Sequence, residues 1–319
     1  IGAGGSRLLR GHTAAHQSLE EYAAEFFAAP KTLYFSSGFQ ANAAIFQALP
    51  SRHDTIIFDE YVHASAREAI QNSQARRIKA KHNDVSSFEN ALKEASASER
   101  EQTWIAIESV YSMDGDVAPL KELYALAEKY DAILIVDEAH GSGVCGPTGR
   151  GVTEEIISKN GYERIVTLHT CGKAIGVAGG LLCASSEIVE TLINTARAFI
   201  YSTAPMPLQA FLVQKSLELI GGEEGRQARE KLQKTSKQAE QYFGGYGTHI
   251  VPIIIGDDAK CVAIAAQLQE VGFDIRAIRP PTVPEATARL RLSLSAALDE
   301  AVIENFSHEF QSIQNRKAA

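Results

Sequence analysis

The most informative stretch of the sequence is Ala132-Ile-Leu-Ile-Val-Asp-Glu-Ala-His140. Its apolar run Ala132–Val136 is continuous, as expected for a strand that is covered on both faces of a parallel sheet. An acid, Asp137, and an imidazole, His140, follow this run closely. Ligands of open α/β sheets bind outside the carboxyl ends of such strands. The stretch therefore predicts a buried strand that delivers two polar side chains to one cleft.

Short apolar runs of the same character alternate with helical patterns along the first two thirds of the chain. These runs are Thr55–Phe58, Trp104–Ile107, Arg164–Leu168 and Leu181–Ala184. The clearest helix is Pro119–Tyr130, which has a proline in its first turn and apolar residues at helical spacing. The alternation predicts an α/β protein in which crossover helices connect a mostly parallel sheet.

The pattern changes around Gly221–Gly225, where a long polar helix begins. The expected elements after this point are a helix at Gly225–Gln241, a strand at His249–Ile255, a helix at Ala259–Val271 and a strand at Ala288–Leu294. We therefore expect two domains, a large one over residues 1–220 and a smaller α+β domain over residues 221–319.

Composition excludes several classes of protein. The 319 residues carry a formal net charge of −8, whereas a nucleic-acid binder needs a basic surface to replace the counterions on phosphate. The apolar runs are far shorter than the roughly 18 residues of a membrane span. Four isolated cysteines have no ligand spacing and no disulfide pattern. We expect a cytoplasmic protein with no metal, membrane or nucleic-acid partner.

A lysine follows the next predicted strand, in His169-Thr-Cys-Gly-Lys173-Ala-Ile-Gly176. This segment is rich in glycine and nearly uncharged, which favours a lysine in a cleft over a solvated one. An amine, an acid and an imidazole at neighbouring strand ends are what pyridoxal phosphate (PLP) chemistry requires. Phe35-Ser-Ser-Gly-Phe39 leads into a predicted helix whose backbone N–H groups, with the Thr170 hydroxyl, suit a phosphate. The sequence therefore predicts PLP as cofactor.

These features resemble the α-oxoamine synthase family of fold-type-I PLP enzymes, along essentially the whole chain. The segments that carry the resemblance are Gly4–Arg7, Ser36–Phe39 with Asn42, His63–Ser65, His82–Asp84, Glu108–Asp116, Val136–Gly141, Thr170–Lys173 and Tyr201–Thr203. The resemblance implies a fold-type-I transferase whose large domain holds a mostly parallel seven-stranded sheet, with a smaller α+β C-terminal domain.

The resemblance also implies roles for four catalytic residues. Lys173 would hold the cofactor covalently, release it to the amino acid and then take the proton from the Cα atom. Asp137 would pair with the pyridinium nitrogen, and His140 with the phenolic oxygen. His63 would stack on the face of the ring; a helix-capping histidine is the alternative.

Further residues are expected at the cofactor by the same resemblance. Gly38, Phe39 and Thr170 would bind the phosphate. Ser202 and Thr203 are similar to residues that reach the cofactor of the partner subunit, which implies a homodimer with shared active sites.

Substrate contacts are expected from three residues. Ser112 would lie near the phenolic oxygen and support both the cofactor and the thioester carbonyl, although a plain turn residue is an equal alternative. Arg291 would clamp the amino-acid carboxylate, with Thr282 also binding substrate. We expect Arg289 to point to the opposite face of the strand as a structural arginine.

Within the family, Ala277–Pro284 and Ala288–Ser293 most resemble the member of the biotin pathway. The implied reaction joins L-alanine to a pimeloyl thioester, on coenzyme A or a carrier protein, and yields 8-amino-7-oxononanoate, carbon dioxide and free thiol. Open alternatives are 2-amino-3-ketobutyrate CoA ligase, which uses glycine and acetyl-CoA, a serine-using condensing enzyme, and a non-catalytic scaffold subunit. Family members begin with a further segment, which we expect to be missing before Ile1.

Overall fold

The computed structural model of the chain describes residues 2–97 and 101–316 and divides into two compact units. The large unit contains Ile1–Val110 and Ala118–Arg226, and the small unit contains Tyr111–Val117 and Gln227–Ala319. The chain thus passes from one unit to the other three times. Each unit is described below by itself.

The large unit is built on a sheet of seven strands in the order β1-β7-β6-β5-β4-β2-β3. The strands are β1 (Lys31–Phe35), β2 (Thr55–Asp59), β3 (Arg76–Ala80), β4 (Thr103–Glu108), β5 (Ala132–Asp137), β6 (Ile165–Thr170) and β7 (Gly180–Ala184). All pairings from β6 to β3 are parallel, and β7 runs antiparallel to β1 and β6. The predicted mostly parallel seven-stranded sheet is confirmed.

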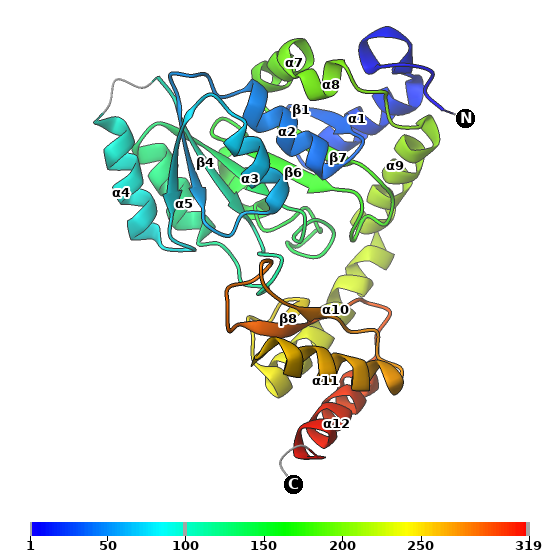
Figure 1. Cartoon of the computed structure of the whole chain (residues 1–319). Helices are drawn as coiled ribbons and strands as arrows, with labels where there is room; N and C mark the ends of the chain where they lie inside the picture. The colour runs from blue at the N-terminus through cyan, green and yellow to red at the C-terminus, as the bar shows by residue number, and fades with distance from the viewer. Residues whose placement is uncertain (1, 98–100, 317–319) are drawn as a thin grey trace. The chain divides into compact units, whose positions relative to one another are not determined.

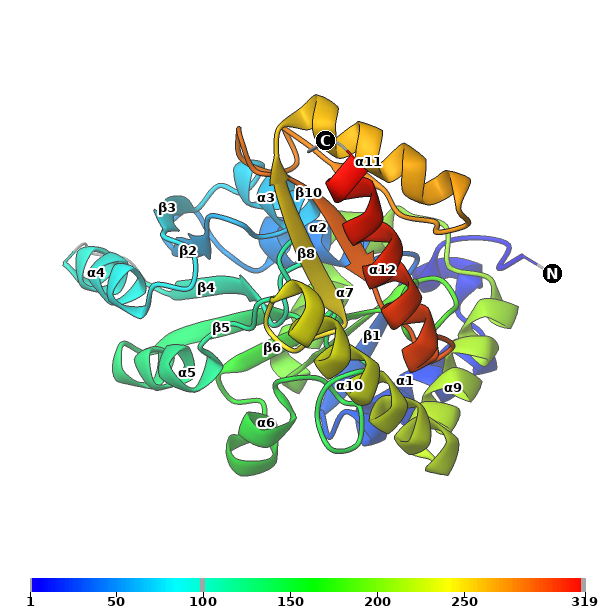
Figure 2. The ribbon, with the colours of Figure 1, turned by 90° about the horizontal axis from the view of Figure 1, so that it is seen from below.

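Helices cover both faces of this sheet (Figures 1 and 2). Those of the large unit are η1 (Arg7–Gly11), α1 (Ala14–Phe26), α2 (Gly38–Ala48), α3 (Ala64–Gln71), α4 (Val85–Ser96), α5 (Leu120–Lys129), α6 (Glu154–Asn160), α7 (Ser186–Thr195), α8 (Arg197–Ile200) and α9 (Pro207–Gly221). Both views show α2 and α3 on one face and α1 and α5 on the other. The predicted helix at Pro119–Tyr130 is α5.

Packing of α2 on the sheet fixes the position of its first turn. Ala41 and Ile45 of this helix are fully buried in one core with Leu168 of β6 and Leu182 of β7. Full burial of an aliphatic side chain contributes about 1.5–3 kcal/mol. The N-terminus of α2 is thereby held beside the carboxyl end of β6.

The small unit has an antiparallel sheet in the order β8-β10-β9, from β8 (Ile250–Gly256), β9 (Ala277–Ile278) and β10 (Ala288–Ser293). Its helices are α11 (Asp258–Glu270) and α12 (Glu300–Arg316), together with most of α10 (Glu223–Phe243). Phe306 of α12 packs edge-on against Phe243 and Phe273. This arrangement is the α+β organisation that the sequence predicts. Within residues 2–97 and 101–316, no helix combines the length and apolar character that a membrane crossing needs.

Candidate active site

Lys173 and His140 meet at the carboxyl edge of the large sheet. His140 lies three residues beyond the end of β5, and Lys173 lies three residues beyond the end of β6. These strands are parallel neighbours, so their ends deliver both side chains to one place. Nζ of Lys173 is 2.6 Å from Nε2 of His140. The predicted juxtaposition of amine and imidazole is therefore present in the structure.

The Asp137 carboxylate at the end of β5 is held in one orientation. Its Oδ1 accepts a hydrogen bond from the Ala139 N–H at 3.0 Å, and its Oδ2 accepts one from the Asn42 amide at 3.1 Å. Asn42 is buried in α2 and also donates to Oγ of Ser65 at 2.9 Å. A buried amide that donates to both groups ties the carboxylate to the start of α3.

His63 is the residue that caps α3. Its Nδ1 accepts from the Ser65 N–H at 3.2 Å and lies 2.8 Å from Oγ of Ser65. Because Nδ1 accepts the Ser65 N–H, it carries no proton, so the proton of the neutral ring is on Nε2 and the Ser65 hydroxyl donates to Nδ1. Desolvation of the ring lowers the pKa of His63, the charge of Lys173 lowers it further, and Asp137 opposes both effects. The ring is therefore kept neutral and oriented.

Gly38, Phe39 and Thr170 lie around the start of α2. The Ser37 hydroxyl caps the helix by accepting the Gln40 N–H at 3.1 Å, and the N–H groups of the first turn need partners from outside the helix. A Cβ on Gly38 would come 3.3 Å from Oγ1 and 3.4 Å from Cβ of Thr170, a tight approach that glycine avoids. The structure brings the predicted phosphate residues together.

This set of groups fits PLP. An aldehyde requires an amine, which Lys173 provides, and a pyridine nitrogen requires an anchored carboxylate, which Asp137 provides. A phosphate requires N–H donors at a helix N-terminus and a hydroxyl, which α2 and Thr170 provide. Because Gly38 has no side chain, the approach between the start of α2 and Thr170 is not narrowed further.

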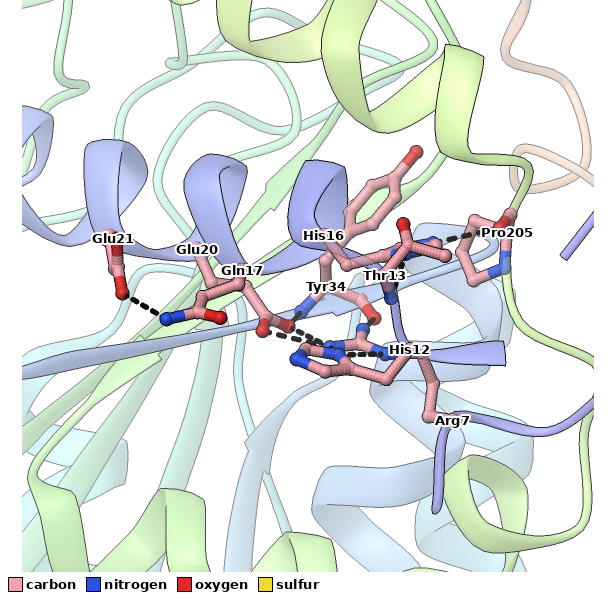
Figure 3. Close-up of polar contacts among 9 residues, drawn as sticks. All are labelled: Arg7, His12, Thr13, His16, Gln17, Glu20, Glu21, Tyr34 and Pro205. Atoms are coloured by element: carbon pink, nitrogen blue, oxygen red, sulfur yellow. Dashed lines mark hydrogen bonds and ion pairs between the residues drawn. The ribbon is translucent and has the colours of Figure 1, made fainter. Parts of the chain in front are cut away.

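A buried polar network braces β1, the strand that precedes the α2 turn (Figure 3). Arg7, only 6% exposed, donates to Glu20 at 2.8 Å and to the Tyr34 carbonyl at 3.0 Å. Glu20 accepts the Tyr34 N–H at 2.8 Å, and the Tyr34 hydroxyl donates to the Ala178 carbonyl at 2.7 Å. The network joins the N-terminal segment to the loop that carries Lys173. Its members Glu20 and Tyr34 were not predicted as functional.

Ser202 and Thr203 follow α8 in an irregular segment of the large unit. Thr203 forms an antiparallel bridge with Ser6, and the next residue, Ala204, donates its N–H to the Gly5 carbonyl at 3.0 Å. His16 also lies 2.8 Å, through Nε2, from the Pro205 carbonyl (Figure 3). The structure thus attaches these two residues to the N-terminal segment.

Glu138, next to Asp137, is a buried acid whose importance the sequence did not reveal. It accepts hydrogen bonds from the Ser109 hydroxyl at 2.6 Å and from both the N–H and hydroxyl of Thr153 at 2.7 Å. Burial raises the pKa of the carboxyl, and these hydrogen bonds oppose the rise. The contacts attach the glycine-rich loop after His140 to the sheet.

The predicted substrate residues Ser112, Thr282 and Arg291 all belong to the small unit. The guanidinium of Arg291 donates to the Ser112 carbonyl at 2.5 Å and to the Ser293 hydroxyl at 2.7 Å. Thr282 is exposed, in a turn that its N–H closes onto the Arg279 carbonyl at 3.0 Å. Within the part of the chain that the structure describes, no carboxylate pairs with Arg291, and burial lowers the pKa of its guanidinium. A half-buried cation of this kind suits an anionic ligand.

The expectation that Arg289 faces away from Arg291 is wrong. Residues two apart in a strand share a face, and both arginines of β10 reach the segment Tyr111–Val117. They differ in their partners, because Arg289 forms an ion pair with Asp114.

Comparison with known proteins supplies the family. The aminotransferase class I and II model matches residues 1–310. An 8-amino-7-oxononanoate synthase from Nitrosospira multiformis is 43% identical, over 95% of this chain and 77% of its own. A variant of the serine palmitoyltransferase from S. paucimobilis, solved with a bound PLP–myriocin aldimine, has a TM-score of 0.90 at 28% identity, covering 98% of this chain and 79% of that one. The 8-amino-7-oxononanoate synthase of Francisella tularensis has a TM-score of 0.82 at 28% identity, with coverages of 99% and 90%. The chain therefore belongs to the aminotransferase class I and II family, and within it to the α-oxoamine synthases.

Proposed function

We propose that this chain condenses L-alanine with a pimeloyl thioester, with loss of carbon dioxide, to give 8-amino-7-oxononanoate and the free thiol in biotin biosynthesis. The observation that carries the proposal is the Lys173–His140 contact of 2.6 Å beside the anchored Asp137 carboxylate. The choice of substrates is supported by the 43% identity to the 8-amino-7-oxononanoate synthase from Nitrosospira multiformis, which extends over 95% of this chain.

The cofactor would be held by residues of the large unit. Bound PLP supplies an aldehyde that takes up an amine and a protonated ring that accepts negative charge from the amino-acid Cα. Lys173 would hold it through Nζ, and once the amine of the amino acid has replaced Nζ on the cofactor, the freed Nζ would take the proton from that Cα. Asp137 would keep the ring nitrogen protonated through the negative charge of its carboxylate, and Asn42 fixes the orientation of that carboxylate. His140 would orient Nζ and the phenolic oxygen.

The remaining groups would bind the phosphate and the substrates and would exclude water from the cofactor. His63, held neutral by its capping contacts, would cover the ring face and keep water from it. Gly38, Phe39 and Thr170 would bind the phosphate. Arg291 would bind the amino-acid carboxylate, and Ser112, whose carbonyl the same guanidinium contacts, would support the thioester carbonyl. Thr282 would contact the acyl substrate.

A homodimer belongs to this proposal, with Ser202 and Thr203 directed at the partner's cofactor. Helix α9 exposes Leu208, Phe211, Leu212 and Leu219 to solvent. An exposed apolar stripe of this kind is typical of a surface that a second copy covers. Phe211→Glu should shift the protein from dimer to monomer in sedimentation velocity. An unchanged dimer would show that α9 is not part of the interface.

We also propose that the large domain gives way to the small one near residue 220, that the segment Tyr111–Val117 counts with the small domain, and that the protein is cytoplasmic. The described cysteines are all free thiols, which suits a reducing compartment.

The test of the reaction uses the purified chain loaded with PLP. Alanine, glycine and serine are each supplied with pimeloyl-CoA, acetyl-CoA or palmitoyl-CoA, and free thiol is measured. Alanine with pimeloyl-CoA should release thiol fastest. If glycine with acetyl-CoA or serine with palmitoyl-CoA is faster, the chain is another α-oxoamine synthase.

A scaffold subunit is the alternative from a different class, and borohydride reduction separates the two. The wild-type chain should carry the cofactor on the peptide that contains Lys173 after reduction, whereas Lys173→Ala should carry none. Lys159→Ala is the matched control, because Lys159 is an exposed lysine paired with Glu155. A colourless, unlabelled wild type would favour the scaffold.

A further inference from the structure

The segment Tyr111–Val117 belongs to the small unit although it lies between two elements of the large one. It leaves the large unit after β4 and returns before α5. Its base is closed within the large unit by a hydrogen bond of 3.1 Å from the Ala118 N–H to the Ser109 carbonyl. The segment is folded on itself by the bonds Tyr111 N–H to Asp116 carbonyl and Gly115 N–H to Tyr111 carbonyl, both 2.9 Å.

The backbone of Gly115 packs closely against the start of β8 and against Thr248, which precedes this strand. The Thr248 hydroxyl donates to the Gly115 carbonyl at 2.7 Å. Gly115 has φ +75°, and a Cβ there would come 2.1 Å from the Ile250 carbonyl oxygen, so the approach requires glycine. The turn is thus closely fitted to the small unit.

One ion pair is the charged contact between the segment Tyr111–Val117 and β10. Arg289, whose side chain is 5% exposed, pairs with Asp114, whose side chain is 30% exposed. The rest of the Arg289 guanidinium is occupied by Thr287, whose carbonyl accepts at 3.1 Å and whose hydroxyl accepts at 3.2 Å. Arg289 is therefore committed to structure, and removing its acid would leave a buried cation without a counter-charge.

The same segment carries Ser112, and the Arg291 guanidinium contacts the Ser112 carbonyl at 2.5 Å. The ion pair between Asp114 and Arg289 is close to this contact in both segments. Asp114 lies two residues after Ser112, and Arg289 lies two residues before Arg291. Whatever fixes Asp114 on β10 therefore also fixes the carbonyl that orients Arg291.

We propose that Asp114 and Arg289 are positioning residues, whose ion pair holds Tyr111–Val117 on β10 and so makes Ser112 and Arg291 one rigid substrate-recognition element. This inference rests on the proposed function, which assigns those two residues to substrate. It adds that the amino-acid clamp and the thioester support move together as parts of the small unit. Neither Asp114 nor Arg289 touches substrate or cofactor in this proposal.

The test compares Asp114→Asn and Asp114→Glu with wild type and with Asp131→Asn, as PLP-loaded enzymes. Asp131 is a matched control, because it pairs with Arg164 on the exposed surface of the large unit. Asp114→Asn should raise KM for alanine by roughly tenfold with a smaller change in kcat, because orientation of a bound group is lost. Asp114→Glu should recover part of that loss. PLP affinity should stay within twofold of wild type.

Hydrogen exchange gives a readout that does not depend on activity. The amides of Tyr111 and Gly115 should exchange roughly tenfold faster in Asp114→Asn than in wild type, while those of β5 stay unchanged. Unchanged exchange together with an unchanged KM in folded Asp114→Asn would overturn the inference. Equal losses of PLP affinity and kcat without a change in KM would also overturn it, because they indicate general damage. If wild type turns over no substrate pair, the proposed function fails, and the exchange arm still decides whether the ion pair holds the segment.

Discussion

Nζ of Lys173 lies 2.6 Å from Nε2 of His140, and the two residues come from the ends of adjacent parallel strands. The contact directs a flexible lysine side chain toward a 9%-exposed imidazole. A lysine ammonium has only donors, so Nε2 is the acceptor when the amine is protonated. The imidazole thus sets where the amine points before any substrate enters.

Replacing His140 should therefore weaken cofactor attachment. His140→Leu removes the acceptor for Lys173 and should lower PLP affinity by about 10- to 100-fold, the range expected for a hydrogen bond to a charged group. The dissociation constant is measured by PLP fluorescence. His53→Leu is the control, because Nε2 of the His53 ring also accepts a hydrogen bond from a cation, Arg52, but on an exposed loop. Equal affinities for His140→Leu and His53→Leu would contradict this role.

Asn42 should matter as much as a group that touches the cofactor. Asn42→Leu leaves both Oδ2 of Asp137 and Oγ of Ser65 without their amide donor. The carboxylate and the His63 cap would both lose orientation, and PLP affinity should fall roughly 5- to 50-fold. Asn160→Leu is the control, since Asn160 bonds a carbonyl at an exposed helix end. A normal affinity with an unchanged visible circular dichroism band would exclude the role.

The fold was predictable where one local pattern dominates. Five of the seven strands are continuous apolar runs because both of their faces are covered. β3 was not identified, because Arg-Arg-Ile-Lys-Ala is an edge strand with exposed Arg77 and Lys79, and edge strands carry charge against further pairing. β1 was also missed, and its mixed start at Lys31 and Thr32 conceals the buried run that follows.

The candidate site, like the fold, has parts that the sequence predicts and parts that it does not. The strand-end rule alone places Asp137, His140 and Lys173 together, because neighbouring parallel strands end at one edge. The contact from Asn42 to Asp137 joins residues 95 positions apart, and the pair Arg289–Asp114 joins residues 175 apart. No local composition marks such contacts, since their partners are fixed only by packing. The role of Tyr111–Val117 as part of the small unit is hidden for this reason.

Gly141 should tolerate no side chain, because of Glu138. A Cβ on Gly141 would lie 1.9 Å from Oε2 of Glu138. That carboxylate cannot swing aside, since Ser109 and Thr153 hold it in a buried position. Gly141→Ala should lower the free energy of unfolding by about 2 kcal/mol or more. Urea denaturation measures the change.

Two variants test this explanation. Gly222→Ala is the control, because a Cβ there meets only ordinary contacts at 3.4 and 3.5 Å. The double variant Gly141→Ala/Glu138→Ala should be less destabilised than the sum of its single changes, as expected when the second change removes the clash. Strict additivity would show that Glu138 is not what excludes a side chain at Gly141.

Acid should destabilise the chain through His169. This fully buried ring stacks on Phe27 at 3.7 Å, and its nitrogens lie 2.7 Å from the Ser142 hydroxyl and 2.8 Å from the Thr167 hydroxyl. Burial lowers the pKa of His169 to about 3, from the ordinary histidine value of 6.5. Between these values the unfolded chain binds a proton that the folded chain does not. The free energy of unfolding therefore falls as pH falls through this range, by up to about 1.4 kcal/mol per pH unit, and the full stability returns above pH 6.5.

His169→Gln should be less stable than wild type near neutral pH, because one amide cannot reproduce both ring contacts, yet its stability should depend less on pH. Urea midpoints from pH 4.5 to 8 measure both effects, and His308→Gln, a change at an exposed histidine of α12, should keep the wild-type slope. The diagnostic quantity is the difference in slope and not the difference in stability, because a cavity or a lost hydrogen bond shifts the whole curve without tilting it. A His169→Gln curve parallel to that of wild type would mean that the folded chain takes up this proton as readily as the unfolded chain.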